Sequence, residues 1–116
     1  MKMLKTGMVV LALTMSIGTI SVQAATTKST DSKTLGKSFS DPWSSTRIND
    51  ETRTFKVGYN TTLINEDYTH TYHKKDSHYA YVKNTGSSQN LKKGSGTYAK
   101  AEIKHHSGTV FYSYTY

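Results

Sequence analysis

The sequence predicts an all-β fold: a small antiparallel β-sandwich with two sheets of about three strands each. Three observations support this prediction. Beyond residue 39, short segments repeatedly alternate large apolar side chains with polar ones, as half-buried strands do. None of these segments contains proline, which lacks the amide hydrogen that a sheet needs. The same region has no sustained period of 3.6 residues, so amphipathic helices are not expected.

Five segments carry the alternation, and they are separated by breaks typical of turns. Lys74-Lys75-Asp76 and His106-Ser107-Gly108 are short enough for hairpins, whereas residues 84–96 are polar, contain three glycines and predict a long loop. These spacings fit about five or six strands folded over into a sandwich. The alternating segments are residues 54–59, 68–73, 77–83, 99–104 and 109–116.

The core of such a domain depends on its aromatic residues. After residue 24 the chain has only 12 Leu, Ile, Val and Phe residues, a number at which disorder becomes a serious alternative. Nine tyrosines and Trp43 add large rings, and each buried aromatic side chain removes about 150–250 Å² from water. We therefore expect a thin, marginally stable core built largely from tyrosine rings.

The N-terminus has the three parts of a cleavable secretory signal. Two lysines precede an apolar run from Met8 to Val22, and Val22-Gln23-Ala24 fits the small-x-small rule, which predicts cleavage between Ala24 and Ala25. A membrane anchor is the alternative, but a spanning helix needs about 20 predominantly apolar residues. This run is shorter and contains several Ser and Thr residues. The sequence thus predicts a secreted, extracellular protein whose mature form has no transmembrane segment.

These features divide the chain into three parts. Residues 1–24 are the predicted signal peptide, residues 25–38 a flexible polar leader and residues 39–116 the β-sandwich domain. The leader is predicted because this segment is rich in Thr, Ser and Lys and has no apolar period. The chain has no cysteine, so disulfide bonds cannot contribute to its stability.

The five histidines, all in the C-terminal half, raise the question of a metal site, because imidazole is a common ligand. On a strand, residues an odd number of positions apart point to opposite faces. His70 and His73 would therefore diverge, and so would His105 and His106 if they are extended. No cysteine or suitably spaced carboxylate accompanies them. We expect no metal site and interpret the histidines as sheet-surface residues.

The sequence gives no indication of catalysis. It contains no Gly-x-Ser-x-Gly elbow, no His-Glu-x-x-His motif and no glycine-rich phosphate loop. The 92 residues after the predicted cleavage site leave little room for both a core and a deep pocket. We expect a protein that is not an enzyme and uses no cofactor.

The positive charge is concentrated in one half of the predicted mature chain. Residues 25–67 hold six basic and six acidic groups, whereas residues 68–116 hold seven lysines and two acidic residues, a net charge of +5. Such a surface attracts anions, including phosphorylated lipids, teichoic-type polymers and nucleic acid. Charge that serves only solubility is the plain alternative. Export argues against nucleic acid as the partner.

Three motifs occur in order in this basic half. They are Tyr68-Thr69-His70-Thr71-Tyr72-His73 with Ser77-His78, Gly96-Thr97-Tyr98-Ala99-Lys100-Ala101 after a polar loop, and the aromatic segment Phe111-Tyr112-Ser113-Tyr114-Thr115-Tyr116. With the signal peptide and the absence of cysteine, this order resembles the lactococcin 972 family of secreted bacteriocins. The resemblance covers roughly half of the chain. Family members carry tryptophan where this chain has Tyr98 and Tyr116.

The resemblance implies a sandwich of two three-stranded antiparallel sheets. It also implies inhibition of related Gram-positive bacteria by binding of the cell-wall precursor lipid II, which blocks septum formation. Lipid II carries a pyrophosphate that a basic surface would attract. From charge and loop position alone, the candidate ligand-binding residues are His73, Lys74, Lys75, Lys92, Lys93 and His105.

The sequence is also compatible with a second function. The protein would instead be a non-toxic surface or adhesion module that binds anionic cell-wall polymer or a protein partner through an exposed sheet edge. Such an edge over residues 109–116 would also pair two subunits into a homo-oligomer, unless the chain itself covers it.

Overall fold

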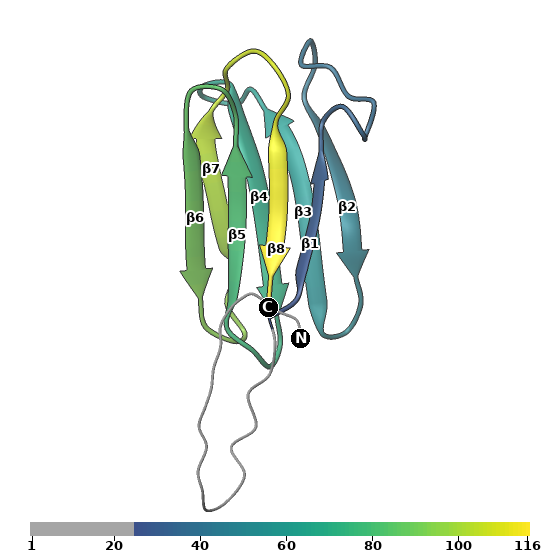
Figure 1. Cartoon of the computed structure of the whole chain (residues 1–116), viewed down its shortest axis with the longest axis vertical. Coiled ribbons are helices and arrows are strands. Elements are labelled where there is room, and N and C mark those ends of the chain that lie inside the picture. Colours follow the sequence, from purple (N-terminus) through teal and green to yellow (C-terminus); the bar gives the residue numbers. More distant parts are fainter. Residues whose placement is uncertain (1–24) are drawn as a thin grey trace, which may run out of the picture.

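The computed structural model describes residues 25–116, and this part of the chain consists of two antiparallel sheets packed face to face (Figure 1). The predicted signal peptide lies outside the described residues. Residues 25–116 contain no helix that is long and apolar enough to cross a membrane. The eight strands are β1 (Thr27–Asp31), β2 (Trp43–Asn49), β3 (Arg53–Asn60), β4 (Glu66–His73), β5 (His78–Lys83), β6 (Ser88–Lys93), β7 (Ala99–Lys104) and β8 (Phe111–Thr115).

The strand order confirms the predicted all-β sandwich and corrects its size. The first sheet has the order β1-β8-β5-β6 and the second sheet β2-β3-β4-β7, so each has four strands where about three were expected. The strands that the alternation did not reveal are β1, β2 and β6, and all three lie at sheet edges. The structure therefore differs from the predicted flexible leader over residues 27–31, which pair with β8, and from the predicted loop over residues 88–93.

Two predicted hairpins prove to be crossovers between the sheets. The turn after β4 leads to β5, and the turn after β7 leads to β8, and in both cases the chain leaves the second sheet and enters the first. Strand β8 accordingly lies between β1 and β5 and has no free edge. Residues 109–116 therefore do not form the exposed sheet edge that would pair two subunits, because the chain itself covers both sides of β8.

The core lies between the two sheets and is less rich in tyrosine than expected. Four of the nine tyrosines are buried, but only Tyr112 and Tyr114 belong to the core cluster, whose other side chains are mostly aliphatic residues and alanines. Trp43, which is only partly buried, packs against this core with its ring 6.1 Å from that of Tyr112. The buried tyrosines are Tyr59, Tyr68, Tyr112 and Tyr114.

Strand β4 shows why fewer tyrosines than expected lie between the sheets. Thr69 and Thr71 face the first sheet and are fully buried, and the Thr69 hydroxyl donates to the main-chain oxygen of Tyr81 in β5 at 2.8 Å. Because side chains alternate along a strand, Tyr68, His70 and Tyr72 lie on the outer face of the second sheet. The aromatic row of β4 therefore covers a sheet surface and does not fill the space between the sheets.

Candidate ligand-binding site

A depression with a volume of about 630 Å³ opens at the end of the sandwich where β4, β6 and β8 end and β5 begins. Its walls combine two aromatic rings, a lysine, a carboxylate and several hydroxyl groups. The lining residues are Ala25, Thr26, His73, Asp76, Ser77, Tyr79, Lys92, Thr115 and Tyr116.

Lys92 and Tyr79 form one wall because they are cross-strand partners in the β5–β6 pair. The Lys92 ammonium group lies 5.7 Å from the centroid of the Tyr79 ring, within the range of a cation–π contact. Lys92 is exposed, and the neutral ring does not neutralise its charge. This wall can therefore hold an anionic group beside an apolar surface.

His73 and His78 are buried, which corrects their interpretation as sheet-surface histidines. The Nδ1 atom of His73 accepts hydrogen bonds from the amides of Lys75 and Asp76, at 3.1 and 3.0 Å. The His78 Nδ1–H donates to the main-chain oxygen of Asp76 at 3.1 Å. Both rings thus hold the turn between β4 and β5 in place. His73 shapes the depression, while its acceptor nitrogen is occupied by the protein's own main chain.

Tyr116 forms the wall next to His73, with 5.1 Å between their ring centroids. The Arg53 guanidinium donates to the Tyr116 hydroxyl and lies 5.5 Å from its ring. The Asp50 carboxylate accepts from the side chain and the amide of Arg53, and these bonds lower the pKa of Asp50 to about 2. Sequence reasoning missed Arg53, although the Asp50-x-x-Arg53 spacing across a turn was a usable signal.

The structure brings most of the predicted ligand-binding residues to this end of the sandwich. Lys74 and Lys75 are exposed in the turn beside the depression, and Lys92 and Lys93 are exposed at the end of edge strand β6. Lys93 is the cross-strand partner of His78, the first residue of β5. Four lysines therefore lie at the same end of the sandwich, and Lys92 is the one that lines the depression.

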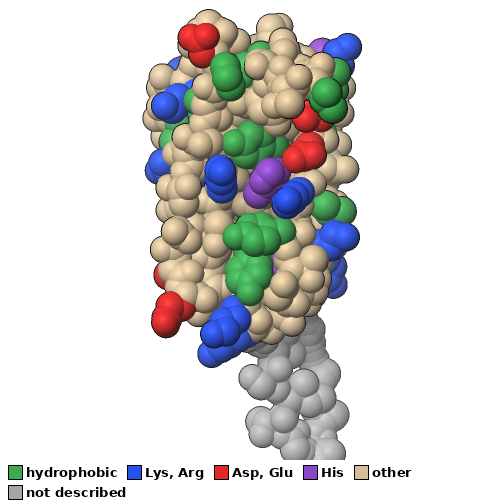
Figure 2. All heavy atoms as spheres, turned by 180° about the vertical axis from the view of Figure 1, so that it is seen from behind, with side chains coloured by type: hydrophobic (Ala, Val, Ile, Leu, Met, Phe, Trp, Pro, Cys, Tyr) green, Lys and Arg blue, Asp and Glu red, His purple; other side chains and the backbone are tan. Residues whose placement is uncertain are grey.

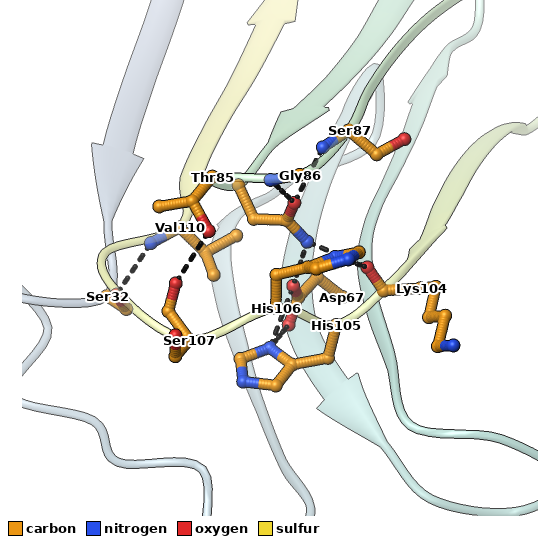
Figure 3. Close-up of polar contacts among 11 residues, drawn as sticks. Ser32, Asp67, Thr85, Gly86, Ser87, Lys104, His105, His106, Ser107 and Val110 are labelled. Atoms are coloured by element: carbon orange, nitrogen blue, oxygen red, sulfur yellow. Dashed lines mark hydrogen bonds and ion pairs between the residues drawn. The ribbon is translucent and has the colours of Figure 1, made fainter.

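His105 lies at the opposite end of the sandwich. Its Nδ1 atom bonds to both carboxylate oxygens of Asp67, near the start of β4, at 2.8 and 2.9 Å (Figure 3). Asn84 donates to the same carboxylate at 2.9 Å and to the main-chain oxygen of Lys104 at 2.8 Å. Asp67 is fully buried, and the Phe39 ring lies 4.3 Å from that of His105. His105 therefore belongs to a buried polar cluster that joins β4 to the segments that follow β5 and β7.

Among residues 25–116, no group of three or more His, Asp or Glu side chains is arranged to hold a metal ion. No known protein family, curated protein or solved structure matches the chain. What the depression can bind is therefore inferred from its own residues.

Proposed function

We propose that the protein is a secreted bacteriocin that binds a cell-wall precursor of the lipid II type at the terminal depression. The observation that carries the proposal is a pocket walled by the Tyr79 and Tyr116 rings and lined by Lys92. Three further lysines are exposed at the same end of the sandwich: Lys74, Lys75 and Lys93. Ammonium groups attract a pyrophosphate, and the exposed parts of tyrosine rings contact sugar or lipid. Inhibition then follows from sequestering the precursor, with no catalytic step.

The mode of approach is electrostatic. Residues 68–116 carry a net charge of +5, and an exposed cluster of this kind raises the local concentration of an anionic ligand. Salt screens such attraction over about 8 Å at physiological ionic strength. Binding and inhibition are both expected to weaken as salt concentration rises.

The test adds purified residues 25–116 to dividing Gram-positive indicator cells and scores growth and septum formation. Replacing Lys74, Lys75, Lys92 and Lys93 by glutamine is expected to abolish inhibition. The matched control is Lys83→Gln, an exposed lysine at the far end of β5, which should inhibit like the unmodified protein. Absence of growth inhibition and of septation defects across a broad panel of strains would refute the proposal.

The position of β6 favours a second candidate, the adhesion module. Strand β6 is a sheet edge, five of its six residues are exposed, and it contributes Lys92 and Lys93. An anionic wall polymer lying along this edge would hold the protein on the producer's own wall. Fractionating a culture distinguishes the two functions, because a bacteriocin is expected in the supernatant and an adhesion module in the wall fraction.

A further inference from the structure

The outer face of the second sheet carries a row of rings that plays no part in the core. Tyr68, His70 and Tyr72 follow one another along β4 on this face, and Tyr98, just before β7, lies beside Tyr72. Tyr98 is 46% exposed and its ring lies 5.0 Å from that of Tyr72. Figure 2, which looks onto this face, shows a histidine between basic side chains with hydrophobic side chains above and below it. We call these four rings the aromatic face.

Two lysines flank the middle of the aromatic face. Lys56, His70 and Lys100 are direct neighbours across β3, β4 and β7, so their side chains lie in one line across the sheet. A second depression, with a volume of about 250 Å³, is lined by these three residues together with Thr54 and Tyr98. The carboxylate of Glu102 bonds to His70 Nε2 at 2.9 Å. Glu102 is therefore paired with His70, and the ammonium groups of Lys56 and Lys100 can pair with an anionic ligand.

The four rings form two contacting pairs. The Tyr68 and His70 rings are 4.6 Å apart and tilted by 34°, and the Tyr72 and Tyr98 rings are tilted by 37°. Each ring is thus already packed against a neighbouring ring. A nucleic-acid base would therefore have to separate a ring pair in order to insert between its members. At Gly58, an added Cβ would lie 2.5 Å from the Tyr68 Cζ atom, so the absence of a side chain lets the Tyr68 ring lie across the sheet.

We propose that the aromatic face binds an acidic glycan, with sugar rings on Tyr98 and Tyr72 and an anionic substituent between Lys56 and Lys100. The apolar C–H face of a sugar packs on the electron-rich face of an aromatic ring. Tyr98 lies across from Tyr72 where the β4–β7 register continues, and the two ring centroids are 5.0 Å apart, so together they form one platform for the sugars of a chain. The hydroxyl groups of Thr54 and Tyr98 supply hydrogen bonds at the rim of the depression. This surface is separate from the terminal depression.

The experiment titrates the purified protein with three matched probes, observed by amide chemical shifts. Tetragalacturonate has four rings and four carboxylates, maltotetraose has the rings alone and tetraglutamate has the charges alone. Tetragalacturonate is expected to bind most tightly and to shift residues of β3, β4 and β7. Glucuronate and glucose 6-phosphate, compared under the same conditions, tell whether the site prefers a carboxylate or a phosphate.

Variants assign the binding to this face. Tyr98→Ser and the pair Lys56→Gln with Lys100→Gln should each weaken tetragalacturonate binding by about tenfold, and Tyr98→Trp should retain it. Lys83→Gln, an exposed lysine at the end of β5 that lines neither depression, should leave it unchanged. Equal binding of tetraglutamate, tighter binding of an oligothymidylate, or no saccharide binding by a protein with an unaltered spectrum would overturn the proposal.

Discussion

Asn84 uses nearly all of its hydrogen-bonding capacity inside the protein. Besides its two donor bonds to Asp67 and Lys104, its side-chain oxygen accepts from the amides of Gly86 and Ser87, both at 2.9 Å. The residue is 4% exposed. Removing such a side chain leaves several buried polar groups without partners, and the cost exceeds that of the lost bonds themselves.

We predict that Asn84→Ala lowers the free energy of unfolding by about 2–4 kcal/mol. Asn90→Ala, at an exposed position of β6, is the matched control and should change it by less than about 0.5 kcal/mol. Urea denaturation followed by circular dichroism measures both. Equal midpoints for the two variants would show that the buried polar cluster is not important for stability.

His70 makes the stability depend on pH. Burial lowers the pKa of His70, and the nearby Lys100 and Lys56 act in the same direction, while the hydrogen bond that His70 donates to Glu102 opposes them. Tyr68 packs on the ring from the same strand. Because the pKa is lower in the folded state, the unfolded chain binds more protons just below pH 6.5. This residue therefore contributes a loss of stability as the pH falls through that value.

We predict that His70→Gln reduces the loss of stability between pH 7 and pH 5. The comparison with the unmodified protein is necessary because the chain contains four other histidines. Thermal melts across this pH range provide the measurement. If the two proteins lose stability in parallel, the lowered pKa of His70 has no thermodynamic consequence.

At the scale of elements, β1 shows how an edge strand is held. Thr26 and Tyr116 exchange two main-chain hydrogen bonds, and the Ser32 amide donates to the Val110 oxygen. In an antiparallel pair, hydrogen-bonded and non-hydrogen-bonded pairs alternate. The Thr26–Tyr116 and Ser32–Val110 pairs are hydrogen-bonded, so every second pair between them is hydrogen-bonded too. The amide of Lys28 therefore points to β8, and the amide of Ser29 points away from it.

Proline substitution distinguishes these two amides. Lys28→Pro is predicted to destabilise the protein by at least about 1 kcal/mol more than Ser29→Pro, because only the first removes a bond to β8. Chemical denaturation of both variants is the measurement. Indistinguishable stabilities would mean that residues 27–31 behave as the flexible leader that their composition predicts.

The strands that could be predicted from sequence are those with one buried face. In β3, β7 and β8, large or apolar side chains at every second position face the core, and this alternation is visible in the sequence. Strand β6 buries only part of Leu91, so its sequence lacks the signal that identifies a strand. Main-chain hydrogen bonds stabilise such edge strands, and these bonds do not require an alternating pattern of side chains.

The candidate site was predictable to a similar extent. Charge and loop position grouped Lys74 and Lys75 with Lys92 and Lys93, and the structure places these lysines at one end because they flank β5 and β6. The same reasoning added His105, which lies at the far end because β7 runs away from the depression. Assigning a loop to an end requires the order and direction of the strands, which periodicity alone does not provide.

On the scale of the whole molecule, the two sheets form one folding unit. Main-chain pairing links β1 to β8, and the chain crosses between the sheets at the turns before β2, β5, β7 and β8. We predict that purified residues 25–116 give a β-type circular dichroism spectrum and a single cooperative thermal transition. A random-coil spectrum in dilute buffer would contradict both the fold and the sites built on it.

The central place of β8 in the first sheet has a kinetic consequence. Its neighbours β1 and β5 are synthesised earlier, but the sheet cannot be completed until this last of the eight strands is available. Contacts between segments so distant in sequence form slowly, since a long loop must close first. The first sheet of a nascent chain would therefore stay incomplete until late in its synthesis, so the whole sandwich can close only when nearly all of the chain has been made.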